Sequence, residues 1–128
     1  MRVLLDTSTM LWWFAGDAKL STTARNVLSD DDTIILVSAA SAWEICAKVR
    51  IGKLPTGHDL CENFLNIMTE HQFEPLAITV EHGRLAGRMA GAHKDPFDRI
   101  LAAQALVENV PLVTSDPAFV AFGVKVVW

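Results

Sequence analysis

The chain lacks any apolar run long enough to cross a membrane. A spanning helix needs roughly 20 consecutive apolar residues, and the first hydrophobic run already ends at Asp6. The opening residues also lack the basic and apolar regions of a secretory signal peptide. We therefore expect a soluble, cytoplasmic protein that does not bind membranes.

Cysteine is scarce in this chain. Only Cys46 and Cys61 occur, without the Cys-x-x-Cys spacing of metal or redox sites, and both fall in segments with helical patterning. Two small buried thiols in a reducing cytosol are the simplest interpretation. A disulfide-stabilised secreted scaffold is therefore not expected.

Positive charge is also in deficit. The 11 basic residues against 15 acidic ones give a net charge of −4 and a pI near 5.4. Nucleic-acid-binding domains are usually basic, so this balance weakens a nucleic-acid role. It does not exclude one, because a bound metal ion would cancel acidic charge locally.

No linker, low-complexity tract or internal repeat interrupts the sequence. The 128 residues are 51% hydrophobic, with a mean hydropathy of +0.27, and this composition excludes a disordered chain. The length is typical of one domain with a substantial core. We therefore predict a single domain over residues 1–128.

Short apolar runs alternate with segments of helical periodicity. The expected strands are residues 2–5, 33–37, 76–79, 111–113 and 124–127. The expected helices are residues 7–15, a segment capped within 21–23, 38–52, 59–71, 80–90 and a stretch opened by Asp95-Pro96. Strands that are continuous apolar runs are typical of a parallel sheet covered on both faces. The pattern predicts a three-layer α/β/α fold with a mostly parallel central sheet.

Four acidic residues stand at strand ends or in the early turns of helices: Asp6, Glu44, Asp98 and Asp116. In open parallel sheets these positions share the edge at which ligands bind. A buried carboxylate is costly without a partner, and one shared divalent cation would compensate all four. Oxygen ligands without Cys or His suit Mg²⁺ or Mn²⁺. Such a site favours hydrolysis of phosphate esters.

Each acid also has a purely structural interpretation. Asp6 and Asp116 each precede a helical segment, so they are candidate N-caps. Asp98 lies in the first turn of its helix, where the helix dipole favours negative charge. Glu44 has mostly apolar neighbours in sequence, and Lys48, four residues further on, is its candidate partner. One common metal site explains all four at once.

Motifs of several other hydrolases and of nucleotide-binding proteins are missing. No P-loop and no Gly-x-Ser-x-Gly elbow is present, and Asp6 lacks the second acid two residues later that Asp-x-Asp phosphatases carry. A metal-dependent small-molecule phosphatase nevertheless remains an alternative. The four histidines lack metal-ligand spacing, and we expect them on the surface or in loops: His58, His71, His82 and His93.

Four segments resemble one known family in their residues and in their order. They are Leu4-Leu5-Asp6-Thr7, Ser41-Ala42-Trp43-Glu44-Ile45, the stretch 95–105 around Asp95-Pro96-Phe97-Asp98-Arg99, and Pro111-Leu112-Val113-Thr114-Ser115-Asp116. Together they resemble the PIN domain, and most closely the VapC toxins of type II toxin–antitoxin modules. The resemblance covers nearly the whole chain. It departs at Ser8, where many relatives have histidine.

The resemblance implies a Mg²⁺- or Mn²⁺-dependent endoribonuclease that hydrolyses RNA with a metal-activated water. Asp6, Glu44 and Asp98 would form the catalytic, metal-binding cluster, and Asp116 would complete it. Asp98 is matched to the family's acid, which leaves Asp95 as the helix cap. A non-catalytic PIN-like module that binds RNA or protein is the other alternative.

The resemblance also implies partners: an RNA substrate, a small antitoxin, a homodimer and a toxin–antitoxin hetero-oligomer. The candidate substrate contacts are four basic residues: Lys48, Arg50, Lys94 and Arg99. Trp12 and Trp13 are the candidate antitoxin contacts. Trp12, Trp13 and Phe14 are consecutive, and neighbouring helix positions diverge by about 100°, so we expect that the three rings cannot all face one core.

Overall fold

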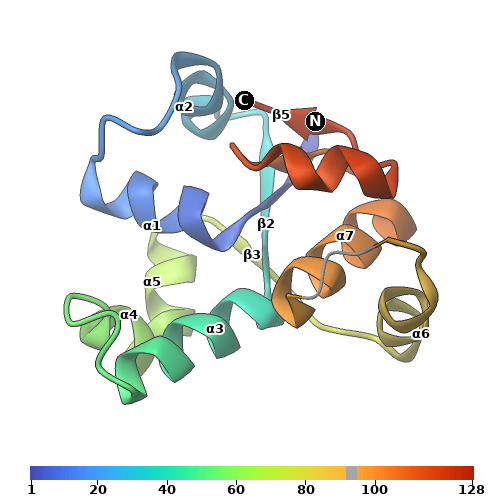
Figure 1. Ribbon diagram of the computed structural model, residues 1–128. Coiled ribbons are helices and arrows are strands. Elements are labelled where there is room, and N and C mark those ends of the chain that lie inside the picture. The colour runs from blue at the N-terminus through green and yellow to red at the C-terminus, as the bar shows by residue number, and fades with distance from the viewer. Residues whose placement is uncertain (92–94) are drawn as a thin grey trace.

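All the strand pairings in the structure are parallel. The computed structural model describes residues 1–91 and 95–128. The strands are β1 (Arg2–Leu5), β2 (Ile34–Ser38), β3 (Glu74–Leu76), β4 (Leu112–Val113) and β5 (Val126–Val127). They form a sheet in the order β3-β2-β1-β4-β5 (Figure 1). The predicted parallel sheet is therefore confirmed, with β1 in its centre.

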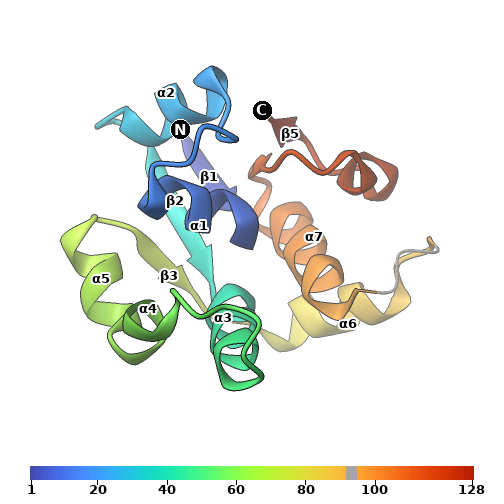
Figure 2. The same cartoon turned by 60° about the vertical axis from the view of Figure 1, so that its left-hand side comes forward.

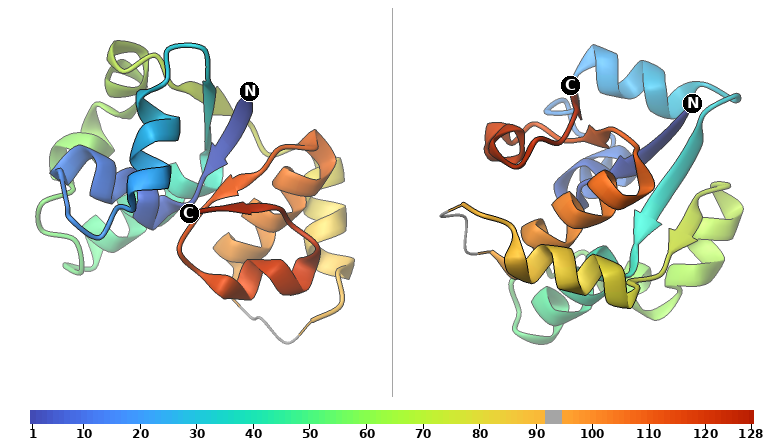
Figure 3. Two further views of the ribbon diagram at one scale, coloured as in Figure 1. Left: turned by 90° about the horizontal axis from the view of Figure 1, so that it is seen from above. Right: turned by 90° about the vertical axis from the view of Figure 1, so that its right-hand side faces the viewer.

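Helices connect these strands and cover both faces of the sheet. They are α1 (Thr7–Ala15), α2 (Thr22–Ser29), α3 (Ala39–Arg50), α4 (His58–Glu62), α5 (Phe64–Glu70), α6 (Val80–Arg88), α7 (Pro96–Glu108) and the 3₁₀ helix η1 (Pro117–Phe122). Figure 1 shows α1, α2 and α5 on one side of β2, with α6 and α7 on the other. Figure 3 shows α6 and α7 in contact side by side.

Alternation along the strands builds two separate cores. Val3 and Leu5 belong to one buried cluster, together with Met10 of α1 and Ile45 of α3. Leu4 belongs to a second cluster that is filled from α7 and η1. Successive strand residues point to opposite faces, so the two clusters lie on opposite sides of one sheet. The three-layer prediction is confirmed.

Polar caps start the helices at the places that the sequence indicates. Ser21, Ser38 and Asp95 each accept a hydrogen bond from a backbone N–H in the first turn of the helix that follows. Gly16 ends α1 in the left-handed conformation, with φ of +63°, which costs a glycine little. The bounds expected for the first strand and the first helix, 2–5 and 7–15, agree with β1 and α1.

Several expected boundaries differ from those in the structure, the helix over 59–71 and the third strand among them. The helix expected over 59–71 is interrupted at Asn63, whose φ of −116° is not helical; its side chain donates to Asp59 over 2.7 Å. The third strand covers Glu74–Leu76 and includes Pro75. An edge strand tolerates proline, because backbone N–H groups on its outer side have no neighbouring strand to bond. Thr79 is no strand residue but the N-cap of α6.

The two cysteines are not free thiols. Cys46 of α3 and Cys61 of α4 form a disulfide, and their Cα atoms are 5.2 Å apart. The expectation of two buried thiols is wrong because α4 packs against α3. Both side chains are only partly buried.

No helix within residues 1–91 and 95–128 is both long enough and apolar enough to cross a membrane.

Candidate active site

Asp6 is held between two strands that are distant in sequence. Its backbone N–H donates to the carbonyl of Val113 over 3.1 Å. Its Oδ2 accepts a hydrogen bond of 2.7 Å from the hydroxyl of Thr114, which is fully buried. The carboxylate is thus fixed at the carboxyl edge of β1 and β4. Asp6 is the N-cap residue of α1, but its carboxylate forms no capping hydrogen bond beyond the contact with the backbone of Thr7, so capping alone does not account for the position of this carboxylate.

The surroundings of Asp6 disfavour its charge. Its pKa is raised from 3.8 to about 6, mainly because burial desolvates the carboxylate. The charges of Asp98 and Glu44 raise the pKa further, while the hydrogen bonds from Thr114 and from the backbone of Thr7 lower it. Three of the four predicted acids therefore interact at one edge of the sheet.

Glu44 lies in the second turn of α3, with a side chain that is 12% exposed. Its Oε2 accepts a hydrogen bond of 2.7 Å from Nζ of Lys48. The partner that the helical spacing indicates is therefore present. One turn before Glu44, the hydroxyls of Ser41 and Thr7 form a buried hydrogen bond of 2.9 Å, which ties α3 to the start of α1.

Asp98 lies in the first turn of α7. Asp95 is the cap of this helix, as predicted, because its Oδ1 accepts from the N–H of Phe97 over 2.9 Å. Helix α3 contacts α7, and Figure 2 shows α3 near the first turns of α7. This packing explains why the charges of Glu44 and Asp98 both act on Asp6.

Asp116 occupies the capping position that the sequence left open as an alternative. Its Oδ1 accepts from the N–H of Ala118 over 2.9 Å at the start of η1. Its own N–H donates to Oγ1 of Thr114 over 3.1 Å. The hydroxyl of Thr114 therefore accepts a hydrogen bond from the backbone of Asp116 and donates one to the carboxylate of Asp6.

The arrangement suits a cation, although it is not a closed metal cage. Within the described ranges, no three acidic, imidazole or thiol side chains are close enough together to hold an ion as they stand. A buried carboxylate whose charge is opposed by two neighbouring acids would nevertheless gain from a divalent cation. The donors are hard oxygens, which Mg²⁺ and Mn²⁺ prefer. Asp6, Asp98 and Glu44 are therefore the residues that would hold it.

The candidate phosphate contacts differ in their surroundings. Arg99 donates from Nε to the carbonyl of Ala86 over 2.9 Å and from Nη2 to that of Met89 over 2.5 Å, so it fastens α7 to the end of α6. Lys48 is bound to Glu44, and Arg50 is exposed at the end of α3. Lys94 lies outside the described residues, as does His93.

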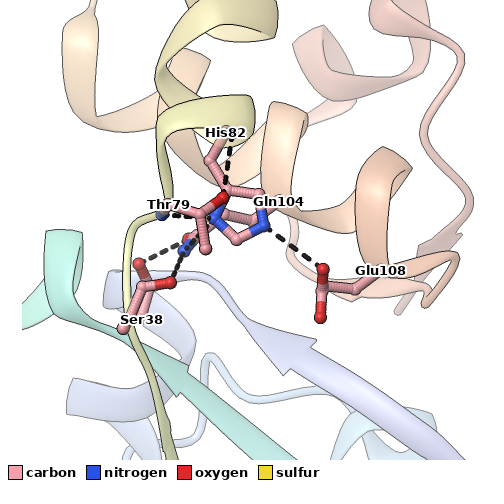
Figure 4. Close-up of polar contacts among 6 residues, drawn as sticks. Ser38, Thr79, His82, Gln104 and Glu108 are labelled. Carbon is pink, nitrogen blue, oxygen red and sulfur yellow. Dashed lines mark hydrogen bonds and ion pairs between the residues drawn. The ribbon is translucent and has the colours of Figure 1, made fainter.

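A buried polar network behind the site was not expected from the sequence. His82, which is 1% exposed, forms a capping box with Thr79, and its Nε2 lies 3.3 Å from Oε2 of Glu108 (Figure 4). Gln104 accepts from the hydroxyl of Ser38 and donates to the carbonyl of Ala77. The surface location expected for His82 is wrong. A glutamine within the apolar stretch of α7 was the available signal for such a network.

A cavity of about 610 Å³ opens beside α1. Its lining includes Trp12 and Phe14 of α1, Leu60 of α4 and Ile67 of α5. The rings of Trp12 and Trp128 are 5.8 Å apart. Trp12, Trp13 and Phe14 are all partly buried against the same core cluster, so the expectation that the three rings could not face one core is wrong. Trp13 is not among the residues that line the cavity. We call this cavity the α1 groove.

Comparison with known proteins identifies one family and several similar folds. A family model described as "PIN domain" matches residues 3–125. No curated protein matches the chain. Three solved structures are similar to this chain in fold, with sequence identities of 17%, 19% and 20%.

The first is VapBC2 from Rickettsia felis bound to a DNA fragment from the promoter. It has a TM-score of 0.73 and 17% identity, over 98% of this chain and 97% of that one. The second is Mycobacterium tuberculosis VapC20, a sarcin-ricin loop cleaving toxin, with a TM-score of 0.69 and 19% identity over 95% of each chain. The third is FitAB bound to an IR36 DNA fragment, with a TM-score of 0.64 and 20% identity, over 97% of this chain and 92% of that one.

Proposed function

Because this chain belongs to the PIN domain family, we propose that it is a metal-dependent endoribonuclease and the toxin of a type II toxin–antitoxin module. The observation that carries the proposal is the position of Asp6 at the carboxyl edge of the sheet, where Thr114 holds its carboxylate. Glu44 and Asp98 lie on α3 and α7, which are in contact, and their charges raise the pKa of Asp6. Three acids whose charges act on one another fit a catalytic metal site better than three separate structural roles. The toxin structures with a similar fold favour the same assignment.

In this proposal each residue has a distinct task. Asp6, Asp98 and Glu44 would hold the metal through their carboxylates. Thr114 orients the carboxylate of Asp6. Asp116 caps η1, and its backbone N–H donates to the hydroxyl of Thr114, so Asp116 affects Asp6 only indirectly. Bound Mg²⁺ supplies electrostatic stabilisation of the phosphodiester and a more acidic water.

The proposed antitoxin occupies the α1 groove. The groove is concave and largely apolar, and aromatic residues of α1 line it, as expected for a surface that receives a partner segment. Structures of VapBC2 and FitAB, whose titles name complexes, have the same fold. A homodimer that joins toxin–antitoxin hetero-oligomers belongs to the proposal.

Cleavage of RNA by purified protein tests the nuclease assignment. Asp98→Asn should lower the Mg²⁺-dependent cleavage rate roughly 100-fold or more, because a metal-binding carboxylate is lost. Asp95→Asn is the matched control on the same helix, since asparagine also caps helices well. Equal activity of both variants and the wild type would refute the assignment. A wild type that binds RNA without cleaving it under Mg²⁺ and Mn²⁺ would identify the non-catalytic alternative.

Expression in cells tests the toxin role. The wild-type chain should arrest growth, and co-expression of the small protein encoded next to it should relieve the arrest. Leu60→Asp in the α1 groove should abolish that relief while RNA cleavage by the purified variant persists. Normal growth with soluble, cleavage-competent protein would exclude the toxin role.

A further inference from the structure

Trp43 is the most exposed tryptophan among the described residues. Its side chain on α3 is 61% exposed, although exposure of an indole to water is unfavourable. Its ring meets that of Phe97 on α7 edge to face, with centroids 4.8 Å apart and an interplanar angle of 79°. Such a contact covers at most one face of the indole. The Phe97 ring therefore braces Trp43 without burying it.

Both rings stand directly beside acids of the candidate active site. Trp43 precedes Glu44, and Phe97 precedes Asp98. Neighbouring helix positions diverge by about 100°, which lets Glu44 and Asp98 act on Asp6 while the ring of Trp43 stays exposed against Phe97. The aromatic pair is therefore adjacent to the acids whose charges raise the pKa of Asp6.

Basic side chains continue along the same helix. Arg50 follows Trp43 by seven residues, which is two helical turns, so both lie on one face of α3 about 10 Å apart along its axis. Arg50 is exposed, and the side chain of Lys48 is 44% exposed. Lys48 is bonded to Glu44, which leaves Arg50 as the cation on the face of Trp43. Exposed aromatic rings and cations along one surface are the combination with which proteins hold single-stranded nucleic acid.

We propose that Trp43, braced by Phe97, stacks on an unpaired base of the RNA strand whose phosphate reaches the acids. This inference rests on the proposed nuclease function. With a net charge of −4, the protein gains little from general attraction to a polyanion, and stacking does not depend on charge. Arg50 follows the backbone of the same strand. The contact selects single-stranded over double-stranded RNA, because bases within a helix offer no free face.

Binding of a fluorescein-labelled single-stranded RNA of about 12 nucleotides, a length within the usual site size of such surfaces, tests the inference. Binding is measured in EDTA, so that no metal supports cleavage. Trp43→Ala should weaken binding roughly 5- to 150-fold, the cost of one lost stacking contact. Trp43→Phe should restore most of the affinity. Val80→Ala, which removes an 85% exposed side chain on α6, should bind as the wild type does.

Binding of RNA variants that each lack one base shows whether the contact of Trp43 is a stacking contact. The penalty of Trp43→Ala should disappear when one particular nucleotide lacks its base, because the partner of the ring is then already absent. In cleavage assays the variant should raise KM more than it lowers kcat. Uniform penalties at every abasic position would overturn the inference.

Two further outcomes separate this inference from its premise. If the wild type cleaves RNA and Trp43→Ala binds and cleaves equally well, the stacking role fails and the nuclease assignment remains. If Trp43→Ala instead converts a dimer to a monomer in light scattering, with unchanged RNA affinity, Trp43 belongs to a protein interface and the inference is overturned. If the wild type neither binds nor cleaves RNA, both fail together.

Discussion

The hydroxyl of Thr114 donates a hydrogen bond of 2.7 Å to the carboxylate of Asp6, across 108 residues of sequence. This bond stabilises the charged form of Asp6 and opposes the burial that raises its pKa to about 6. Thr114→Val keeps the shape of the side chain and removes the hydroxyl, so the pKa of Asp6 should rise further. Mg²⁺ affinity at neutral pH, read from the metal-induced shift in Tm, should fall roughly 10- to 150-fold, given about 1.5–3 kcal/mol for a hydrogen bond to a charged group. Thr114→Ser retains the donor and should bind Mg²⁺ almost normally; equal losses in both variants would point to packing instead.

Asp6→Asn should stabilise the metal-free protein at neutral pH. A raised carboxyl pKa means that the folded state holds its proton more tightly than the unfolded state, so the free energy of unfolding falls as pH rises from about 4 to about 6. Above that range the charge costs roughly 2 to 3 kcal/mol, and asparagine avoids this cost. Urea unfolding in EDTA should show the gain at pH 7.5 and its disappearance at pH 4. A loss of stability at pH 7.5 would mean that the Asp6 carboxylate is structural.

Gln104→Ala should destabilise the fold without touching the candidate site. The amide is fully buried and links the hydroxyl of Ser38 to the carbonyl of Ala77. Truncation leaves a cavity and unpaired polar groups, with an expected cost of about 2 to 4 kcal/mol in urea unfolding. Val107→Ala lies on the same helix with 39% exposure and should cost less than about 1 kcal/mol. Equal effects would mean that the network adds nothing.

The disulfide between Cys46 and Cys61 should be detectable by thiol chemistry. Denatured protein should release no reactive thiol until it is reduced. Because the cysteines are 15 residues apart, reduction should lower the free energy of unfolding by about 3 kcal/mol. The double variant Cys46→Ser, Cys61→Ser should show this lower stability with and without reductant. Two titratable thiols in the unreduced protein would refute the bond.

Local signals predicted the first third of the fold well. Asp6 ends the first strand and Gly16 ends the first helix, so both boundaries can be read from single residues. The interruption at Asn63 could not, because the helical spacing of apolar residues continues through it. It depends on how α4 packs against α3, which is a tertiary effect.

The positions of the candidate acids on strands and helices could be predicted from the order of the elements. The bonding partners of individual side chains could not. Parallel strands share a carboxyl edge, which is why the charges of Asp98 and Glu44 act on Asp6, while the metal-binding roles of these acids stay a prediction. Arg99 was expected at phosphate, but its guanidinium binds backbone carbonyls at the end of α6. Asp116 had two acceptable roles in the sequence, and only the folded chain shows it capping η1.

The central position of β1 has a consequence for synthesis of the protein. Asp6 is made almost first, yet its neighbours in the sheet come from β2 on one side and from β4 on the other. A nascent chain that has not yet reached residue 98 carries Asp6 and Glu44 but lacks Asp98 and Thr114. The acidic edge is completed only when the last quarter of the chain has left the ribosome, so the order of synthesis delays the assembly of the candidate site until the chain is almost complete.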